Sequence, residues 1–326
     1  MTQTLRKVAI VGSARIPFCR AYTGYENESN LSMLSTAIGG VAEKYGLKGQ
    51  RIGEVMAGSV ISHSKDFNLA REAAGSDTVS DSPVVLGPKM QKRMIAMSRA
   101  RTTGEKLSAF KGFNFGEITP VAPSTQEPRT GLSMGEHCEL MAKQWGISRE
   151  AQDLLALRSH QNAAAAYDSG FHDDLIVPCA GIYKDNNIRP DTSLEKMATM
   201  KPAFDKKSGK GTLTAANSTP LTDGASSVLL ASEDWARERD LPILGYLTMG
   251  AVSANDFAHG DGLLMAPTIA VSDLMRRSGL SFADIDLFEL HEAFAAQVLC
   301  TLAAWEDPDY NRAVLGRDDP LGAVPV

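Results

Sequence analysis

The chain has 326 residues, of which 43% are hydrophobic and 22% are charged, so it is long enough for two domains or one large composite domain. Its formal net charge of −6 argues against nucleic acid as the main partner. No apolar run approaches the roughly 20 residues that a membrane span needs, and the N-terminal stretch has no signal-peptide core. We therefore expect a cytoplasmic protein without a transmembrane segment.

Four cysteines, Cys19, Cys138, Cys179 and Cys300, are scattered along the chain without a CxxC pair. This spacing argues against disulfides and against a structural zinc site, so we expect no metal. A nucleophilic cysteine needs a pKa lowered by a helix N-terminus or a nearby base. Cys138 directly follows His137, and adjacent residues do not share a helix face. We interpret all four cysteines as structural residues that behave as small buried hydrophobes.

The N-terminal segments predict an α/β core. Residues 7–11 are expected to form a buried strand, and residues 31–45 an alanine- and leucine-bearing helix that ends near Gly46. Residues 52–61, with the sequence IGEVMAGSVI, favour a second strand. A strand, a loop, a helix and a further strand in this order are typical of an α/β arrangement.

The segment of residues 86–110 is basic, and the spacing of Met90, Met94 and Met97 favours an amphipathic helix. Its cations are Lys89, Lys92, Arg93, Arg99, Arg101 and Lys106, against Glu105 alone. A solvated surface helix is the plainer interpretation. A surface for a partner subunit, for membrane lipid or for the phosphates of a ligand is the alternative.

Residues 130–177 predict two further helices. The first comprises residues 134–145, and the second is capped by Ser148 and runs to Gly170. His160 lies on the second helix, and we interpret it as a structural or surface residue.

The next stretch, KPAFDKKSGKGTLTAANSTPLTDGA, contains a basic loop and a turn. Lys206, Lys207 and Lys210 alternate with glycines in a loop that could meet a phosphate, and a purely solvated loop is an equal alternative. Asn217 and Asp223 favour a tight, hydrogen-bonded turn, in which we expect both to have a structural role.

The second half of the chain begins near residue 241. Residues 243–249 favour a strand, and Pro267 and Gly279 are typical of the start and the stop of a helix. Residues 285–290 suggest another strand, which runs into His291 and an alanine-rich helix. A polar residue at such a junction would lie where unpaired helical N–H groups favour a developing oxyanion.

Several strings together carry a family resemblance: HEAFAAQ, RTGLSMGEHCE, SREAQDLLALRSH and the NST and DGA stretches. On these the chain resembles the thiolases. The resemblance implies an α/β thiolase fold of two similar βα halves in a layered α/β/α/β/α arrangement. It implies an N-terminal half of residues 1–235, with a mostly helical loop domain inserted at about 84–205, and a C-terminal half of residues 236–326.

By the same resemblance the function would be acyl transfer between a 3-ketoacyl-CoA and coenzyme A, in fatty-acid β-oxidation or acetoacetyl-CoA metabolism. Coenzyme A would be a substrate, with no permanently bound cofactor. His291 would help to bind the thioester oxygen. Ser133, Met134, Thr248 and Phe294 match positions that hold coenzyme A in thiolases.

The resemblance also implies partners. Thiolases form homodimers or homotetramers, so we expect one of these. Many members have a histidine where this chain has Ser133, and a serine occurs in the branch that pairs with a hydratase–dehydrogenase subunit of β-oxidation.

Two thiolase segments have no counterpart here, and both halves are therefore expected to be incomplete. The string FNLAREA is followed directly by GSDTVSDSP, with the join near residues 74/75, where thiolases carry the nucleophilic cysteine on a buried helix. The C-terminal stretch also lacks the catalytic histidine and the second reactive cysteine. We predict that the chain as given is inactive, with apolar faces left uncovered.

Three readings of this pattern remain open. The sequence could lack two pieces of a complete thiolase, which the abrupt joins favour. It could be a truncated chain that binds acyl-CoA or a partner without catalysis. It could also be another acyl-transfer or hydrolytic enzyme that uses a remaining cysteine or serine, although no GxSxG elbow supports this.

Overall fold

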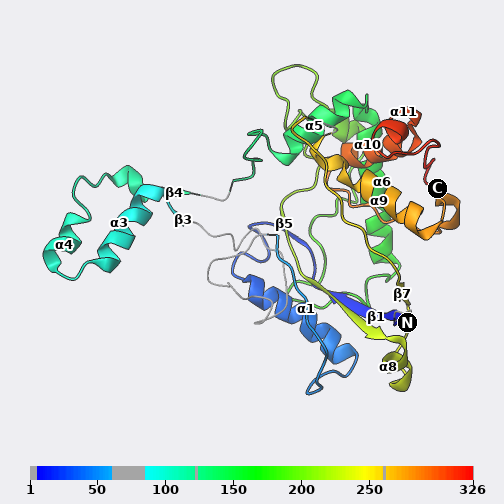
Figure 1. Ribbon diagram of the computed structural model, residues 1–326, viewed down its shortest axis with the longest axis horizontal. Helices are drawn as coiled ribbons and strands as arrows, with labels where there is room; N and C mark the ends of the chain where they lie inside the picture. Colours follow the sequence, from blue (N-terminus) through cyan, green and yellow to red (C-terminus); the bar gives the residue numbers. More distant parts are fainter. Residues whose placement is uncertain (1–5, 61–84, 122–123, 260–261, 326) are drawn as a thin grey trace.

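A three-stranded antiparallel sheet forms the centre of the lower body in Figure 1. The computed structural model describes residues 6–60, 85–121, 124–259 and 262–325. Strand β1, Val8–Arg15, lies in the middle and pairs with β6, Ser226–Ser232, on one side and with β7, Gly245–Leu247, on the other. The predicted strand at residues 7–11 is confirmed, and it continues through the buried Arg15.

Helix α1, Asn30–Lys44, covers one face of this sheet, as the sequence predicts. Ser29 and Ser32 form a capping box at its start. Met33, Leu34, Ala37 and Val41 recur at helical spacing and are buried. A short pair, β2 (Cys19–Arg20) and β5 (Thr222–Asp223), lies at the edge of the same core.

The second strand predicted at residues 52–61 is wrong over residues 52–60, which have no regular structure, and residue 61 lies outside the described residues. Met56 is 84% exposed there. A strand needs a partner edge, and β1 pairs instead with β6 along one edge and with β7 at Val8–Ile10 along the other. The strand that follows α1 in the chain is thus replaced by strands from much later in the sequence.

The other face of the sheet is apolar and exposed. Residues directly opposite in an antiparallel pair point to the same face, so Leu230 shares a face with Ile10, and Leu247 shares it with Val8. Val228, Leu230 and Leu247 are 58%, 46% and 53% exposed. The sequence-based prediction of uncovered apolar faces is confirmed here.

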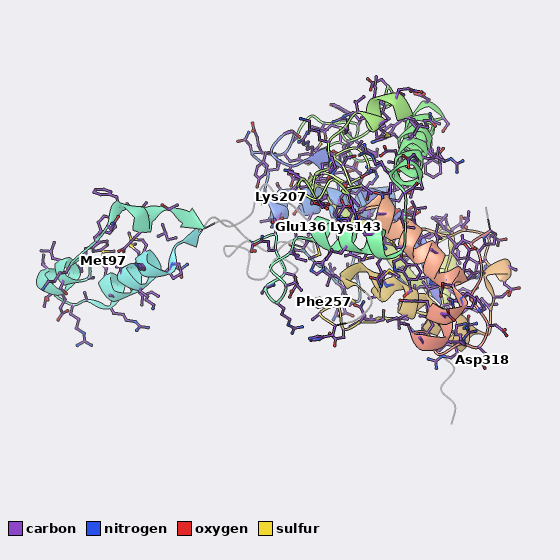
Figure 2. The ribbon with its side chains drawn as sticks, turned by 90° about the horizontal axis from the view of Figure 1, so that it is seen from above. Met97, Glu136, Lys143, Lys207, Phe257 and Asp318 are labelled. Carbon is purple, nitrogen blue, oxygen red and sulfur yellow. The ribbon has the colours of Figure 1, made fainter. Side chains whose placement is uncertain are left out.

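Residues 85–121 form a lobe that stands apart from the rest of the described chain (Figures 1 and 2). It comprises β3 (Val85–Leu86), α3 (Pro88–Arg99), α4 (Thr103–Ser108), the 3₁₀ turn η1 (Phe115–Ile118) and β4 (Pro120–Val121). The helix predicted from Met90, Met94 and Met97 is confirmed as α3, but it ends at Arg99 and does not extend to residue 110. Thr102 and Glu105 make a capping box that starts a new helix, and this divides the segment in two.

The upper body is helical. Its elements are α5 (Met134–Gln144), α6 (Arg149–Asp168), α7 (Leu194–Ala198), η2 (Leu263–Met265), α9 (Ala266–Ser278), η3 (Phe282–Asp284), α10 (Ala295–Glu306) and α11 (Pro308–Ala313). Helix α8 (Glu233–Glu238) lies beside the sheet in the lower body. The predicted helices at 134–145 and after Ser148 are confirmed as α5 and α6, with Ser148 as a cap. Pro267 and the left-handed Gly279 bound α9 as expected.

The strand predicted at residues 285–290 does not form. This stretch follows η3 and pairs with no strand in the described parts of the chain, and Leu287 in it is 90% exposed. The strand expected at residues 243–249 is present as the shorter β7, which is the only strand described within residues 236–326. None of the helices in the described parts of the chain is long and apolar enough to cross a bilayer.

Candidate functional site

Two of the strings singled out in the sequence lie side by side in the structure. The Thr219 N–H donates to the Ala293 carbonyl at 2.8 Å, and the Ala295 N–H donates to the Asn217 carbonyl at 3.1 Å. Between these bonds, Ser218 and Phe294 form an isolated antiparallel bridge. The NST turn and the HEAF string, about 75 residues apart in sequence, are thereby joined at the start of α10.

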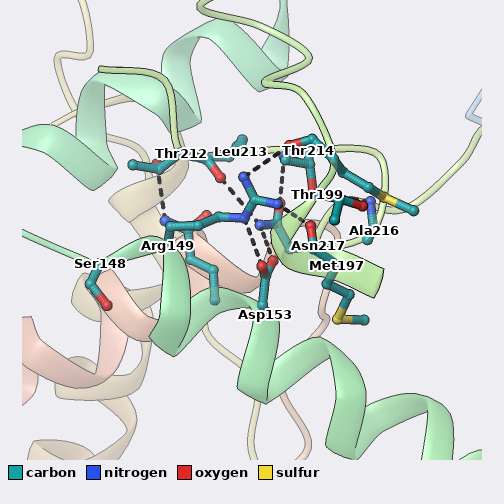
Figure 3. A network of polar contacts seen from close by, with 12 residues as sticks. Ser148, Arg149, Asp153, Met197, Thr199, Thr212, Leu213, Thr214, Ala216 and Asn217 are labelled. Atoms are coloured by element: carbon teal, nitrogen blue, oxygen red, sulfur yellow. Dashed lines mark hydrogen bonds and ion pairs between the residues drawn. The ribbon is translucent and has the colours of Figure 1, made fainter. Parts of the chain in front are cut away.

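Asn217 is the centre of a buried polar network that fixes the NST turn to α6 (Figure 3). Its amide nitrogen donates to Asp153 Oδ1 at 2.8 Å, and its amide oxygen accepts from the Thr214 N–H at 2.7 Å. Asp153 also accepts from Arg149 Nε at 2.7 Å, and the same guanidinium donates to the Met197 carbonyl. The structural role predicted for Asn217 is confirmed, because both ends of its amide are used.

Glu139 anchors the same turn to α5. This buried carboxylate accepts from the backbone N–H of Thr212 at 2.8 Å, from its hydroxyl at 3.0 Å and from the N–H of Leu213 at 3.0 Å. Three donors compensate the cost of burying a charge. Sequence reasoning missed both Glu139 and Asp153. No local signal could have found Glu139, because its hydrogen-bond donors, Thr212 and Leu213, lie on a segment distant in the sequence.

An open groove of about 710 Å³ lies between the start of α5 and residues 203–207. Its lining residues are Ser124, Thr125, Gln126, Ser133, Glu136, Ala203, Phe204, Asp205, Lys206 and Lys207. Figure 2 shows Glu136, Lys143 and Lys207 near one another on the body. Phe204 connects the groove to the HEAF string, since its ring meets that of Phe294 edge-on at 5.8 Å.

The groove carries both cations and fixed carboxylates. Lys206 and Lys207 are exposed at its rim, while Asp205 is held by Lys143 and by the Ser208 hydroxyl. These bonds, first of all the one from Lys143, hold the pKa of Asp205 well below its usual range. The Ser133 N–H donates to Glu136 at 2.7 Å, and this bond lowers the pKa of Glu136. Both carboxylates are thus occupied within the chain, which leaves the two lysines for a ligand.

Comparison with known proteins places the chain in a family. The thiolase N-terminal domain matches residues 96–234, and the thiolase C-terminal domain matches residues 242–314. The 3-ketoacyl-CoA thiolases of Yersinia enterocolitica and Serratia proteamaculans are each 34% identical to it, over 98% of this chain and 83% of theirs. The chain belongs to the thiolase family.

These thiolases contain residues that the chain does not. The match with each extends over 367 aligned positions, more than the 326 residues of this chain. Positions of the relatives within the aligned span therefore have no counterpart here. The join near residues 74/75, where we expect such a gap, lies outside the described residues.

Solved structures establish the thiolase fold. The acetyl-CoA acetyltransferase of Bacillus anthracis superposes with a TM-score of 0.75 at 23% identity, over 99% of this chain and 89% of that one. The human mitochondrial 3-ketoacyl-CoA thiolase, solved in complex with CoA, superposes with a TM-score of 0.70 at 24% identity, over 98% and 88%.

The site residues predicted for this thiolase-family chain do not all lie at the groove. Ser133 lines the groove and caps α5, and Met134 is the exposed first residue of that helix. Phe294 is buried beside the groove wall. His291 is exposed in the extended stretch before α10, and Thr248 is exposed just after β7. As the described residues form it, the groove is not lined by His291 or Thr248.

His291 does not lie at the first turn of α10, as the sequence suggested. The helix starts at Ala295, with Phe294 as its cap. Two N–H groups of its first turn are also taken, because Ala295 donates to the Asn217 carbonyl and Gln297 donates to the Phe294 carbonyl at 3.0 Å. An oxyanion beside His291 would therefore be bound by the side chain and not by the helix terminus.

All four thiols of the chain are buried. Burial raises the pKa of Cys19 to about 11 and that of Cys300 to about 12, and it also raises the pKa of Cys138 and Cys179. Thiolate is the nucleophilic form, and it is disfavoured at each position. The interpretation of these cysteines as structural residues is confirmed. Within the described residues, no group of three or more His, Cys, Asp or Glu side chains could hold a metal ion.

Proposed function

We propose that this thiolase-family chain binds coenzyme A thioesters in the groove beside α5. The reaction class is acyl transfer between a 3-ketoacyl-CoA and coenzyme A, in fatty-acid β-oxidation or acetoacetyl-CoA metabolism. The names of the 34%-identical relatives support this class. The observation that carries the proposal is the groove itself, with free cations at its rim and a wall ring in contact with the HEAF string.

Several residues in and beside the groove would hold the ligand. Lys206 and Lys207 would bind the phosphates of coenzyme A by charge. Ser133 and Met134 would contact the ligand from the start of α5, and Phe294 would support the wall through Phe204. These interactions position the ligand and do not break a bond.

The two exposed residues would act at the acyl end of the ligand. His291 would donate a hydrogen bond to the thioester oxygen, and Thr248 would contact the pantetheine arm. Both lie on segments next to elements of the second half of the chain, after β7 and before α10.

We further propose that the 326-residue chain does not catalyse thiolysis of a 3-ketoacyl-CoA. The thiolase reaction starts with attack by a cysteine thiolate, and the four thiols here are buried with raised pKa values. Loss of the nucleophile in covalent catalysis lowers the rate by several orders of magnitude. The alternative to an acyltransferase is a thiolase-like protein that binds acyl-CoA or a partner without catalysis. The buried thiols favour this alternative.

The finer architecture and the assembly remain proposals. We propose halves of residues 1–235 and 236–326, with a loop domain at about 84–205, in the five-layered thiolase arrangement. The gap between the two matched domains, at residues 235–241, supports the boundary. We also propose a homodimer or homotetramer in the cytoplasm, with a hydratase–dehydrogenase subunit as a further partner.

Calorimetric titration with coenzyme A, together with a thiolysis assay on a 3-ketoacyl-CoA, tests the function. We expect the full chain to bind coenzyme A, and K206E/K207E to bind roughly tenfold or more weakly because two cations become anions. R51E/R158E changes the same charges at exposed positions that do not line the groove and should bind as the wild type does. Equal affinity for both variants would refute the site. Thiolysis should stay at background, and turnover of about 1 s⁻¹ or faster would refute the predicted inactivity.

A further inference from the structure

The loop of residues 203–213, here called the lysine loop, closes on itself beside the groove. The Ala203 N–H donates to the Leu213 carbonyl at 2.8 Å, and this bond joins the two ends of the loop. A Cβ at Gly211 would overlap the Asp205 carbonyl oxygen, so the two strands of the loop approach at a distance that glycine permits. The lysine loop therefore has a defined shape, although its tip at residues 206–210 is exposed.

Asp205 connects the tip of the lysine loop to the wall of the groove. Its Oδ1 accepts from the backbone N–H of Ser208 at 3.0 Å and from that of Lys207 at 3.3 Å. Its Oδ2 accepts from the Ser208 hydroxyl and from the ammonium group of Lys143 on α5. The Ser208 hydroxyl oxygen accepts in turn from the Lys210 N–H at 3.0 Å. One carboxylate thus fixes the backbone around the exposed lysines and ties it to a helix.

The charge of Asp205 is opposed to the use of the groove for an anion. Asp205 lines the groove together with Lys206 and Lys207, which we propose to bind phosphates. A carboxylate at that place lowers the positive potential that attracts a phosphate, so charge alone would favour a neutral residue. Its contacts with the loop backbone and with Lys143 are a reason of another kind for an aspartate at this position.

We infer that Asp205 is a positioning residue, which orders the lysine loop so that Lys206 and Lys207 are held at the groove before the ligand arrives. The inference rests on the proposed function, because coenzyme A is the anion that the two lysines would bind. A loop that is ordered only on binding loses conformational entropy at that moment, and this loss weakens the affinity. A loop that is already ordered by Asp205 avoids the loss, and this gain outweighs the repulsion between one neutralised carboxylate and the ligand.

Two substitutions of Asp205 separate its position from its charge, since both remove the same negative charge. Asp205→Asn keeps an oxygen that can accept from the Lys207 and Ser208 N–H groups, whereas Asp205→Ala removes every one of these bonds. Calorimetric titration of the full chain with coenzyme A should give affinities that fall from the wild type to Asp205→Asn to Asp205→Ala, the last roughly tenfold weaker than the wild type. Glu54→Gln removes the same charge at an exposed position that does not line the groove, and it should bind as the wild type does.

Hydrogen exchange of the ligand-free chain adds a measurement that does not depend on coenzyme A. The amides of residues 206–210 should exchange faster in Asp205→Ala than in the wild type or in Glu54→Gln. The amides of α1, which packs in the other body, should exchange at the wild-type rate in all three proteins. Faster exchange in both places would mean that the substitution loosens the whole fold, and it would overturn a role confined to the lysine loop.

The binding results can also overturn the inference. Affinity of Asp205→Ala for coenzyme A equal to that of the wild type, or tighter, would show that charge and not position governs the effect of Asp205. Unchanged exchange of residues 206–210 in Asp205→Ala would show that the carboxylate does not order the lysine loop. A wild type that fails to bind coenzyme A, with exchange as expected in Asp205→Ala, would refute the proposed function and uphold the ordering of the lysine loop by Asp205.

Discussion

Asn217 connects elements that are distant in sequence. Its amide joins the NST turn to Asp153 on α6, and its carbonyl accepts from Ala295 at the start of α10. Glu139 adds a third anchor through Thr212. The turn beside the groove is therefore positioned by buried polar bonds, which are geometrically stricter than apolar contacts.

At this scale we predict that Asn217→Ala destabilises the chain by about 2–4 kcal/mol, because Asp153 and the Thr214 N–H each lose a buried partner. Urea denaturation measures the change. Asn27→Ala, at an exposed asparagine, is the matched control and should stay within about 0.5 kcal/mol of the wild type. A denaturation midpoint for Asn217→Ala equal to that of Asn27→Ala would show that the network contributes little.

The helices of this protein begin and end at local signals. Ser133 and Ser148 cap α5 and α6, and Gly279 ends α9 in the left-handed region with a φ of 70°. A non-glycine residue in that conformation is strained by its Cβ. The position is otherwise open, because a Cβ at Gly279 would meet nothing within 4 Å.

We therefore expect Gly279→Ala to lower the stability by about 1 kcal/mol through backbone strain alone. Gly104→Ala is the comparison, since Gly104 lies inside α4 with ordinary helical geometry and the same free space. That change should be neutral or stabilising by up to about 1 kcal/mol. Thermal melts of the two variants, measured side by side, test this expectation. Equal changes in the melting temperature would show that backbone strain at Gly279 is not the cause.

The whole molecule has many carboxylates stabilised by cations and hydroxyls. The bond from Arg93 lowers the pKa of Glu117, the bond from Lys143 lowers that of Asp205, and bonds led by Arg237 lower that of Glu233 to about 2. These groups lie on the lobe of residues 85–121, at the groove and beside the sheet, so acid affects all three of these parts of the fold.

The pH dependence follows from the sign of these shifts. A folded pKa below the unfolded value of about 4 means that the unfolded chain takes up protons first as the pH falls. The stabilisation is complete above about pH 5 and is lost as the pH drops through 4 toward 2. We predict a lower melting temperature at pH 3 than at pH 6. Calorimetry at the two pH values tests this, and an unchanged melting temperature would refute it.

The sequence by itself determined the family, the helices α1, α5, α6 and α9 and the structural cysteines. Helices are predictable from short segments because their hydrogen bonds and caps are local. The family strings are local as well, and HEAFAAQ with RTGLSMGEHCE was sufficient to indicate it.

Only the tertiary structure decided which strands form and which polar groups are buried. The strand predicted at residues 285–290 finds no partner, while β1 pairs with two strands that come more than 200 residues later. In the sequence alone, Glu139 and Asp153 look like exposed residues of a helix. The folded structure places the NST turn against both of them. Strand pairing and charge burial depend on segments distant in the chain, and for that reason no local pattern could predict them.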